Sequence, residues 1–233
     1  MIAAPMPAKR PRYTPNLRCA DCRLHKSLCI CAQMPSLPAR THLVLLLHQL
    51  EDHKPTNTGR LAVRCLPNSE IAARGHSSAE AIPDWLSRAK HPVVLFPHPL
   101  ARPLADFRAL DGPVTLIVPD GTWRQAKRAR QRIAGLDAVP CAILPPGAPS
   151  IFLLRHDPRP GHLCTIEAIA RAMGILESPA IEDQLMHMLR IAQDRTLWSG
   201  GRLPTAQVTG GIPEGVRPHD PLQVGTPRAP SLL

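Results

Sequence analysis

The stretch TLIVPDGTWRQAKRARQR, residues 115–132, joins an apolar segment to a strongly basic one. Together with the preceding residues, its apolar part forms the run 112–120, which is short, β-branched and bounded by prolines. Such a run is typical of a buried strand. The segment that follows, 122–136, predicts a helix that ends near Gly135. A strand that leads directly into a helix favours βαβ units, and therefore an α/β fold with a mostly parallel sheet flanked by helices.

The same alternation continues on both sides of this stretch. Short apolar runs predict further strands at 41–49, 91–99 and 139–146. Residues 150–157 fit either a fifth strand or a loop. Helical patterns are found at 56–66, 78–89, 164–177 and 180–198. We therefore expect a flexible basic N-terminus (1–16), a cysteine-rich module (17–38), an α/β domain (39–198) and an irregular or disordered tail (199–233).

The predicted helix at 122–136 is unusually basic. Arg124, Arg128 and Arg132 lie at positions i, i+4 and i+8, and Lys127 lies beside them, with no acidic residue to offset the like-charge repulsion. The whole chain carries a formal net charge of +10. Such a surplus favours polyanionic partners, and a phosphate backbone would compensate the clustered cations. A solvated basic surface is the alternative interpretation.

The cysteine count and the absence of long apolar runs indicate a cellular compartment. No run approaches the ~18 residues that span a bilayer, so no membrane association is expected. The first sixteen residues lack the apolar core of a secretory signal. The seven cysteines are an odd number, which argues against a disulfide framework. A cytoplasmic location is therefore expected.

Four of the seven cysteines lie within thirteen residues. They are Cys19, Cys22, Cys29 and Cys31, arranged as C-x2-C-x6-C-x-C. Two close pairs of thiolates on a short loop suit a tetrahedral Zn²⁺ ion, and four protein ligands leave no open position, which predicts a structural role. An iron–sulfur cluster is the main alternative, and four free buried cysteines are a third.

The junction VPDGTW lies where ligands gather in open α/β sheets, beyond the carboxyl end of a strand. Asp120 fits either an N-cap of the following helix or a catalytic or ligand-binding carboxylate. Trp123 fits either packing of the helix onto the sheet or stacking on a flat ring such as a nucleobase. The local pattern leaves both pairs of alternatives open.

Four blocks in this order resemble the DTW-domain family, the tRNA-uridine aminocarboxypropyltransferases. The family's Asp-x-Thr-Trp motif corresponds to residues 120–123, and its four-cysteine module to 19–31. The segment HQLEDHKPTNTGRL (48–61) is similar to the family's Thr-Asn-Thr-Gly-Arg-Leu block. The segment GHLCTIEAIA (161–170) is similar to its Ser-Thr-Ile-Glu-Ala block, with Cys164 in place of the expected serine.

The resemblance, which covers roughly residues 17–195, implies a SPOUT-like fold and leaves open whether its C-terminal part is knotted. It implies S-adenosylmethionine as donor, tRNA as partner and 3-(3-amino-3-carboxypropyl)uridine as product. We expect Asp120 to act as general base or to orient the uridine. Thr122 is expected to form a hydrogen bond with the donor or the nucleobase, and Trp123 to stack on the adenine or the uracil. The expected donor-binding residues are Asn57, Thr58, Arg60, Thr165 and Glu167. The basic residues of the helix, Arg124, Lys127, Arg128 and Arg132, are expected to bind RNA.

Two other functions remain compatible with these residues. An RNA methyltransferase could use the same fold and donor but attack a different carbon of the sulfonium. A non-catalytic RNA-binding module that contains zinc would not bind the donor at all.

Overall fold

Six short strands assemble into one sheet in the computed structural model, which describes residues 17–52, 54, 56–74, 82–154 and 162–217. Their order is β2-β1-β5-β3-β6-β4, and every neighbouring pair is parallel. This result confirms the predicted parallel α/β sheet. The strands are β1 (His42–His48), β2 (Ser69–Arg74), β3 (Pro92–Leu95), β4 (Arg102–Pro103), β5 (Thr115–Asp120) and β6 (Cys141–Ile143).

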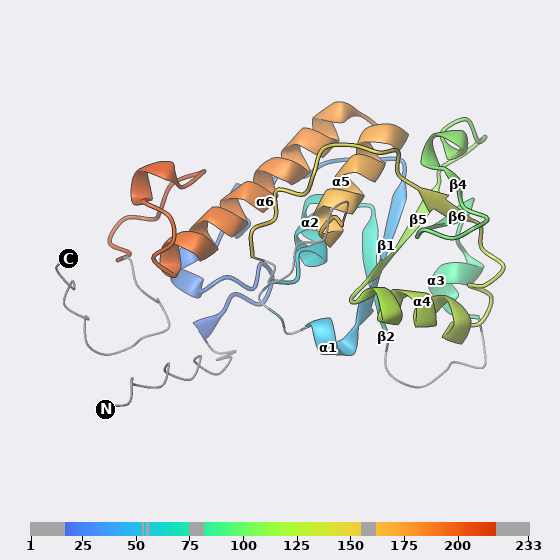
Figure 1. The fold of residues 1–233 in the computed structure, drawn as a ribbon, viewed down its shortest axis with the longest axis horizontal. Helices are drawn as coiled ribbons and strands as arrows, with labels where there is room; N and C mark the ends of the chain where they lie inside the picture. The colour runs from blue at the N-terminus through green and yellow to red at the C-terminus, as the bar shows by residue number, and fades with distance from the viewer. Residues whose placement is uncertain (1–16, 53, 55, 75–81, 155–161, 218–233) are drawn as a thin grey trace, which may run out of the picture.

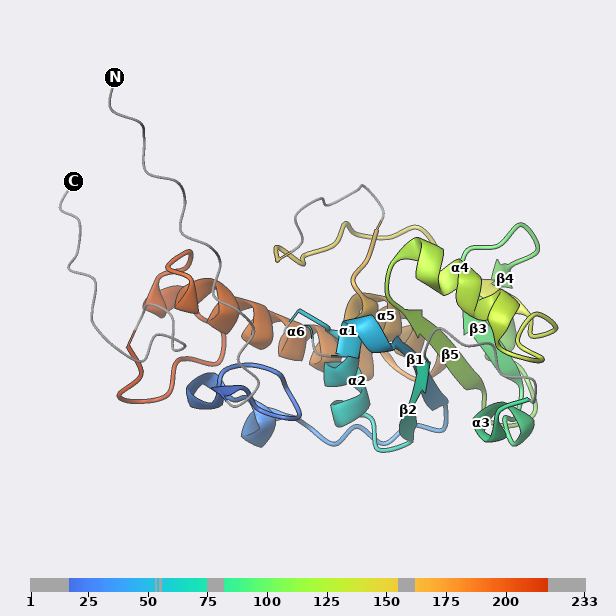
Figure 2. The same ribbon diagram turned by 90° about the horizontal axis from the view of Figure 1, so that it is seen from below.

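Helices cover both faces of the sheet (Figures 1 and 2). One face carries α2 (Gly59–Cys65), α5 (Thr165–Leu176) and α6 (Pro179–Ser199), and the other carries α3 (Asp84–Ser87) and α4 (Trp123–Arg132). The four-residue helix α1 (Gln49–Asp52) directly follows β1. The predicted helices at 56–66, 122–136, 164–177 and 180–198 are thus present. The first three are shorter than predicted, and the last is one residue longer at each end.

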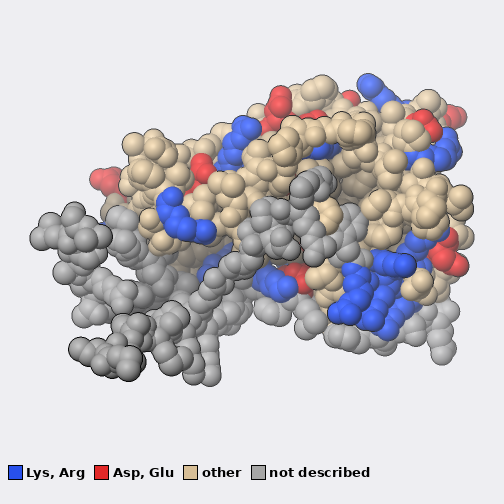
Figure 3. Space-filling view, in the orientation of Figure 1, with Lys and Arg blue, Asp and Glu red and all other residues tan. Residues whose placement is uncertain are grey.

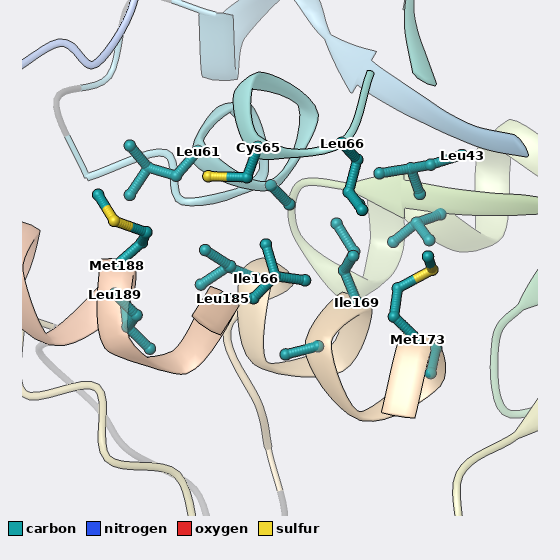
Figure 4. Packing of buried hydrophobic residues seen from close by; sticks show 14 of the residues in the cluster. Leu43, Leu61, Cys65, Leu66, Ile166, Ile169, Met173, Leu185, Met188 and Leu189 are labelled. Atoms are coloured by element: carbon teal, nitrogen blue, oxygen red, sulfur yellow. The ribbon is translucent and has the colours of Figure 1, made fainter. Parts of the chain in front are cut away.

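The alternation of side chains along β1 explains why the sheet is packed between helices on both of its faces. Leu43 and Leu45 belong to the larger hydrophobic cluster, on the side of α2, α5 and α6. Val44 and Leu46 point the other way, into a smaller cluster on the side of α3. Figure 4 shows how leucine, isoleucine and methionine side chains from α2, α5 and α6 fill the larger cluster. Strands that are buried on both faces read as continuous apolar runs, as 41–49 does.

Three elements differ from the sequence-based expectation. β2 was not predicted because its sequence, SEIAAR, has neither period-2 alternation nor a β-branched run, although it pairs along its whole length with β1. β4 has only two residues. The helix predicted at 78–89 is reduced to α3, and residues 75–81 lie outside the described part. The segment 150–154 forms no strand, and residues 155–157 are not described.

The cysteine-rich module and the segment after α6 pack against the same body. The described residues of the module include the 3₁₀ turns η2 (Lys26–Leu28) and η3 (Cys31–Gln33), and the module shares the larger hydrophobic cluster with α6. After α6 the described residues 200–217 include one 3₁₀ turn, η5 (Thr205–Gln207), and bury Val208. None of the helices in the described ranges has the length and apolar character needed to cross a membrane.

Candidate active site

Asp120 is the last residue of β5, and its side chain is buried, with only 5% of the residue exposed. Its carboxylate oxygens accept hydrogen bonds from Asn57 Nδ2 at 2.5 Å and from Thr165 Oγ1 at 2.6 Å. Burial raises the pKa of Asp120, and these two hydrogen bonds partly offset that effect. The N-cap of α4 is Thr122, whose hydroxyl accepts from the Gln125 backbone N–H. The carboxylate of Asp120 is therefore directed away from that helix and towards Asn57 and Thr165.

Two glycines allow this arrangement. Gly121 turns the chain out of β5 with a φ of +136°, which side chains other than glycine rarely adopt. Gly59 begins α2, and a Cβ atom at this position would lie only 3.1 Å from Thr165 Cγ2. The starts of α2 and α5 therefore meet closely, and the Ile166 backbone N–H donates to Thr58 Oγ1 at 3.3 Å.

A cavity of about 1100 Å³ lies beyond the carboxyl ends of β5, β3 and β6. The strand order changes direction between β1 and β5, because the chain continues from β1 to β2 on one side and from β5 to β6 on the other. Ligands of open α/β sheets bind at the carboxyl ends of the strands near such a point. Five residues predicted for the site line it, namely Asn57, Thr58, Asp120, Thr122 and Thr165. Apolar side chains form much of the remaining wall, among them Leu95, Phe96, Val118, Leu144, Phe152 and Leu154.

Glu167 and Arg60, which were also expected to bind the donor, do not line this cavity. Glu167 is 1% exposed and accepts three hydrogen bonds, from the Ser150 hydroxyl and from the backbone N–H groups of Ile151 and Cys164. It therefore fixes the start of α5 and the loop before it. The guanidinium of Arg60 forms an ion pair with Asp52 in α1. Neither placement favours a contact with the donor.

The cationic residues of α4 lie on its outer surface. Arg124, Lys127, Arg128 and Arg132 are exposed, and Figure 3 shows Lys and Arg side chains gathered over this helix. Arg124 also lines the cavity, which places the basic surface beside the candidate site. Trp123 is the first residue of α4, and its side chain lies outside the described part of the structure.

The four cysteines of the module come together. All four Sγ atoms lie within 4.8 Å of one another, with 3.6 Å between Cys19 and Cys31 and 3.8 Å between Cys22 and Cys29. A tetrahedral zinc site with Zn–S bonds of about 2.3 Å requires S···S separations of about 3.8 Å. Burial raises the pKa of Cys22 to about 11, so a bound cation would be needed to hold this group as a thiolate at neutral pH. The geometry thus fits a single metal ion.

A buried cation lies next to this centre. Arg195 of α6 is 2% exposed and donates hydrogen bonds to the backbone carbonyls of Leu28 and Cys29, at 3.2 and 3.0 Å. The same guanidinium donates to the carbonyls of Gly210 and Gly211. Arg195 therefore links the cysteine module, α6 and the segment after it. Sequence reasoning did not identify this residue, because an arginine within an amphipathic helix reads as exposed.

Sequence reasoning also missed residues on the far wall of the cavity. These are Arg171 of α5, His162, and the loop 144–148 that follows β6. A signal for Arg171 was present, since it lies two steps of three residues after Thr165 on the same predicted helix, and residues with this spacing share a face. The loop gave no comparable signal, because proline-rich loops are common throughout this chain.

A parallel sheet with a buried, hydrogen-bonded carboxylate in a large cavity at its carboxyl edge defines an α/β domain built to bind a ligand there. The chain belongs to the DTW domain family, whose model matches residues 16–197. The family's name motif supplies the Asp120 carboxylate just described.

Proteins similar to this chain occur in animals and plants. The tRNA-uridine aminocarboxypropyltransferase 2 of Macaca fascicularis is 30% identical over 207 residues, which cover 84% of this chain and 67% of that protein. The mouse (Mus musculus) protein of the same name is 28% identical over 79% of this chain, and the match covers 65% of its own length. The tRNA-uridine aminocarboxypropyltransferase A of Arabidopsis thaliana is 28% identical, with 74% and 78% coverage.

One solved structure is similar in part. It is the SAM-dependent rRNA:acp-transferase Tsr3 from Vulcanisaeta distributa, with 19% sequence identity and a TM-score of 0.44. The similarity covers 68% of this chain and 78% of that one.

Proposed function

We propose that this chain is a tRNA-uridine aminocarboxypropyltransferase. It transfers the 3-amino-3-carboxypropyl group of S-adenosylmethionine to N3 of a tRNA uridine. The observation that carries this proposal is the Asp120 carboxylate, which belongs to the family motif and lies in a cavity bordered by a cationic helix. The relatives that bear this name support it. The chain spans less than two thirds of the mouse relative, so the activity is proposed for the matched part.

The reaction requires a base because the imide nitrogen of uridine is a poor nucleophile while it carries its proton. Asp120 accepts the N3 proton, and the N3 electron pair attacks the γ-carbon of the methionine moiety in line with the sulfonium. The carbon–sulfur bond breaks, its electron pair stays on sulfur, and methylthioadenosine leaves. Asn57 and Thr165 keep the carboxylate oriented throughout, since each donates to a different oxygen.

The size and lining of the cavity suit two reactants. Its volume of about 1100 Å³ is slightly above the usual range for a single drug-sized ligand, so it has room for the donor and a nucleobase together. The apolar wall suits the flat adenine ring and the methylthio group. When both reactants are held in one cavity, the bimolecular reaction becomes effectively unimolecular. The protein then lowers the barrier chiefly by holding the reacting atoms in the correct geometry.

The remaining expectations become parts of the same proposal. The cysteine module holds one Zn²⁺ ion, because sulfurs this close together surround a single ion, whereas a multinuclear iron–sulfur cluster spreads its ligands apart. Four thiolate ligands leave no open position, so the ion is structural. Arg124, Lys127, Arg128 and Arg132 bind tRNA phosphates. The cytoplasmic location stays a prediction.

The decisive experiment incubates purified protein with tRNA and S-adenosylmethionine and analyses the tRNA nucleosides by mass spectrometry. We expect an aminocarboxypropyl adduct on uridine in wild type and a decrease of about 10²- to 10⁴-fold in Asp120→Ala, the usual contribution of a general base. Asp111→Ala, which changes an exposed carboxylate outside the cavity, is the matched control and should retain the wild-type rate.

Each alternative function predicts a different result in this experiment. A methyl adduct in place of the heavier group would identify a methyltransferase. No adduct, together with no binding of S-adenosylmethionine, would identify a non-catalytic RNA-binding module. Near-normal turnover of Asp120→Ala would reject the assignment of the base while leaving the transferase activity in place.

A further inference from the structure

Among the described residues, the lysine and arginine side chains that line the cavity are Lys54, Arg124 and Arg171, and they differ in their surroundings. Lys54 forms an ion pair with Glu51 at 2.6 Å, so its charge is already offset. Arg124 projects from α4, within the basic outer surface of that helix. Arg171 projects from α5, which covers the face of the sheet opposite to the one that α4 covers. Arg171 thus comes from a different element than the proposed RNA surface.

The position of Arg171 is set by the helix and by the loop above it. Thr165, Ala168 and Arg171 all line the cavity at intervals of three residues, so Arg171 lies about 9 Å along the helix axis from the residue that binds Asp120. Its Nη2 group donates to the Ala148 carbonyl. A Cβ atom on Gly147 would lie 2.9 Å from its Nη1. The loop therefore approaches the guanidinium closely at this glycine.

This guanidinium retains donors for a ligand. Five N–H groups are present on arginine, and the hydrogen bond to Ala148 uses one of them. No acidic side chain pairs with Arg171 among the residues that the structure describes. Arg171 also lines a second groove together with Glu182 and Asp183, but it forms no ion pair with either of these described residues.

We propose that Arg171 binds the α-carboxylate of the group that is transferred, and thereby sets which carbon of the sulfonium faces the nucleophile. This inference rests on the proposed function. The donor presents a carboxylate, which a guanidinium recognises by two parallel hydrogen bonds. Arg60, the arginine expected for this task, is paired with Asp52 and does not line the cavity.

The dimensions of the donor agree with this assignment. Three carbon–carbon bonds of about 1.5 Å separate the γ-carbon from the carboxylate carbon. A nucleophile in contact with Asp120 lies about 3–3.5 Å from the carbon that it attacks. The γ-carbon can therefore lie near Asp120 while the carboxylate reaches the second turn of α5. With the carboxylate held there, the γ-carbon rather than the methyl group is presented to N3.

The test compares the donor with methylthioadenosine, which lacks the aminocarboxypropyl group and the positive charge of the sulfonium. Calorimetry measures the binding of S-adenosylmethionine and of methylthioadenosine to wild type and to Arg171→Met. We expect Arg171→Met to lose about 10- to 100-fold in affinity for S-adenosylmethionine, as for a lost charged hydrogen bond, and to bind methylthioadenosine as wild type does. Arg171→Lys should recover part of the lost affinity.

The matched control is Arg190→Met, which removes an exposed arginine that lines the adjoining groove but not the cavity. It should leave both affinities unchanged. If Arg171→Met loses the same affinity for both ligands, or loses affinity for neither, the assignment of Arg171 is overturned. The proposed function would still stand in that case, provided that the wild type forms the uridine adduct. A wild type that binds neither ligand would overturn both.

Discussion

At the scale of single residues, the chemistry depends on how the protein holds one carboxylate. Burial alone would leave Asp120 protonated over a wide pH range, because a buried charge is unfavourable. Hydrogen bonds from Thr165 and Asn57 favour the ionised form and counteract this effect. The result is a carboxyl group with a pKa above its ordinary value, which is a better match to a proton acceptor at neutral pH than an exposed aspartate.

The first prediction concerns this balance. Thr165→Val keeps the shape of the side chain but removes the hydroxyl that donates to Asp120, so the pKa of that carboxyl should rise further. A general base acts only when ionised, so activity is present above this pKa and is lost as the pH falls through it. The acidic limb of the kcat/KM profile should therefore move to higher pH. Thr196→Val is the control, because the Thr196 hydroxyl donates to a carbonyl within α6. If the acidic limb has the same position in wild type, Thr165→Val and Thr196→Val, the role of Asp120 as base is contradicted.

The second prediction separates Glu167 from the catalytic residues. Its side chain accepts three hydrogen bonds in a buried environment, so Glu167→Ala leaves three donors without partners, at about 1–3 kcal/mol for each. Thermal unfolding followed by circular dichroism should show a decrease in Tm of about 10 °C. The exposed Glu214→Ala variant should unfold like wild type. A stable Glu167→Ala protein with weakened donor binding would instead restore the role first expected from sequence.

Part of this site could be predicted from the sequence, and the reason is local. Asp120 was identifiable because the end of an apolar run followed by a helix marks the carboxyl edge of a sheet. Its partners Asn57 and Thr165 are 63 and 45 residues away, and the resemblance pointed to them without showing that they bind the same carboxylate. Arg60 was expected in the cavity, but its guanidinium instead forms an ion pair with Asp52. Such competition between partners is decided by the fold and leaves no trace in the local pattern.

At the scale of elements, the basic residues of α4 fall into two groups, one that contacts the protein interior and one that is exposed to solvent. Arg130 binds inward, where its guanidinium donates to Cys141 Sγ at 2.6 Å and to the Asp137 carbonyl at 2.5 Å. It therefore ties α4 to β6. Arg124, Lys127 and Arg128 are exposed on the same helix and make no such contact with the described residues. The like-charge repulsion among them is a cost to the isolated helix that a polyanion would remove.

The third prediction follows from this division. A variant with three of the four exposed cations of α4 replaced by alanine should bind tRNA more weakly and should lose about 2 to 3 from the slope of log affinity against log salt concentration. The matched control removes the same charge from other exposed positions. The three α4 residues are Arg124, Lys127 and Arg128, and the control residues are Arg88, Arg102 and Arg190. Equal slopes for the two triple variants would locate the RNA surface outside α4.

The apolar pattern of the sequence predicts the central strands of the sheet but not its edge strands. β1 and β5 lie in the centre of the sheet and read as continuous apolar runs, so both were predicted. β2 and β4 are edge strands, and neither has such a run. The pairing of β2 with β1 holds it in place, a tertiary effect that overrides the weak strand propensity of its residues.

At the scale of the whole molecule, the cysteine module is held to the sheet domain by the end of α6. Arg195 binds carbonyl groups of the module, and Trp198 is buried against Leu28 of the module and Val208 of the segment after α6. With the proposed Zn²⁺ ion bound, four thiolates and the ion would carry a net charge of −2, which would compensate the buried guanidinium. A metal ion here would therefore stabilise the contact between the module and α6 as well as the cysteine loop.

The last prediction tests this coupling by removing the metal. A structural metal supplies folding free energy, so its loss should unfold the loop 19–31 and expose the contact between Leu28 and Trp198. The indole N–H of Trp198 donates to Thr205 Oγ1 at 2.9 Å, so this tryptophan also reports on the segment after α6. Treatment with a chelator should shift its fluorescence emission to longer wavelength and lower the Tm, while elemental analysis records the loss of one equivalent of zinc. The variant Trp198→Phe isolates this signal from that of the other two tryptophans and should show little change in emission. Complete loss of zinc with an unchanged Trp198 signal and an unchanged Tm would mean that the module and α6 hold together without the ion, and that Arg195 and the apolar contacts are sufficient.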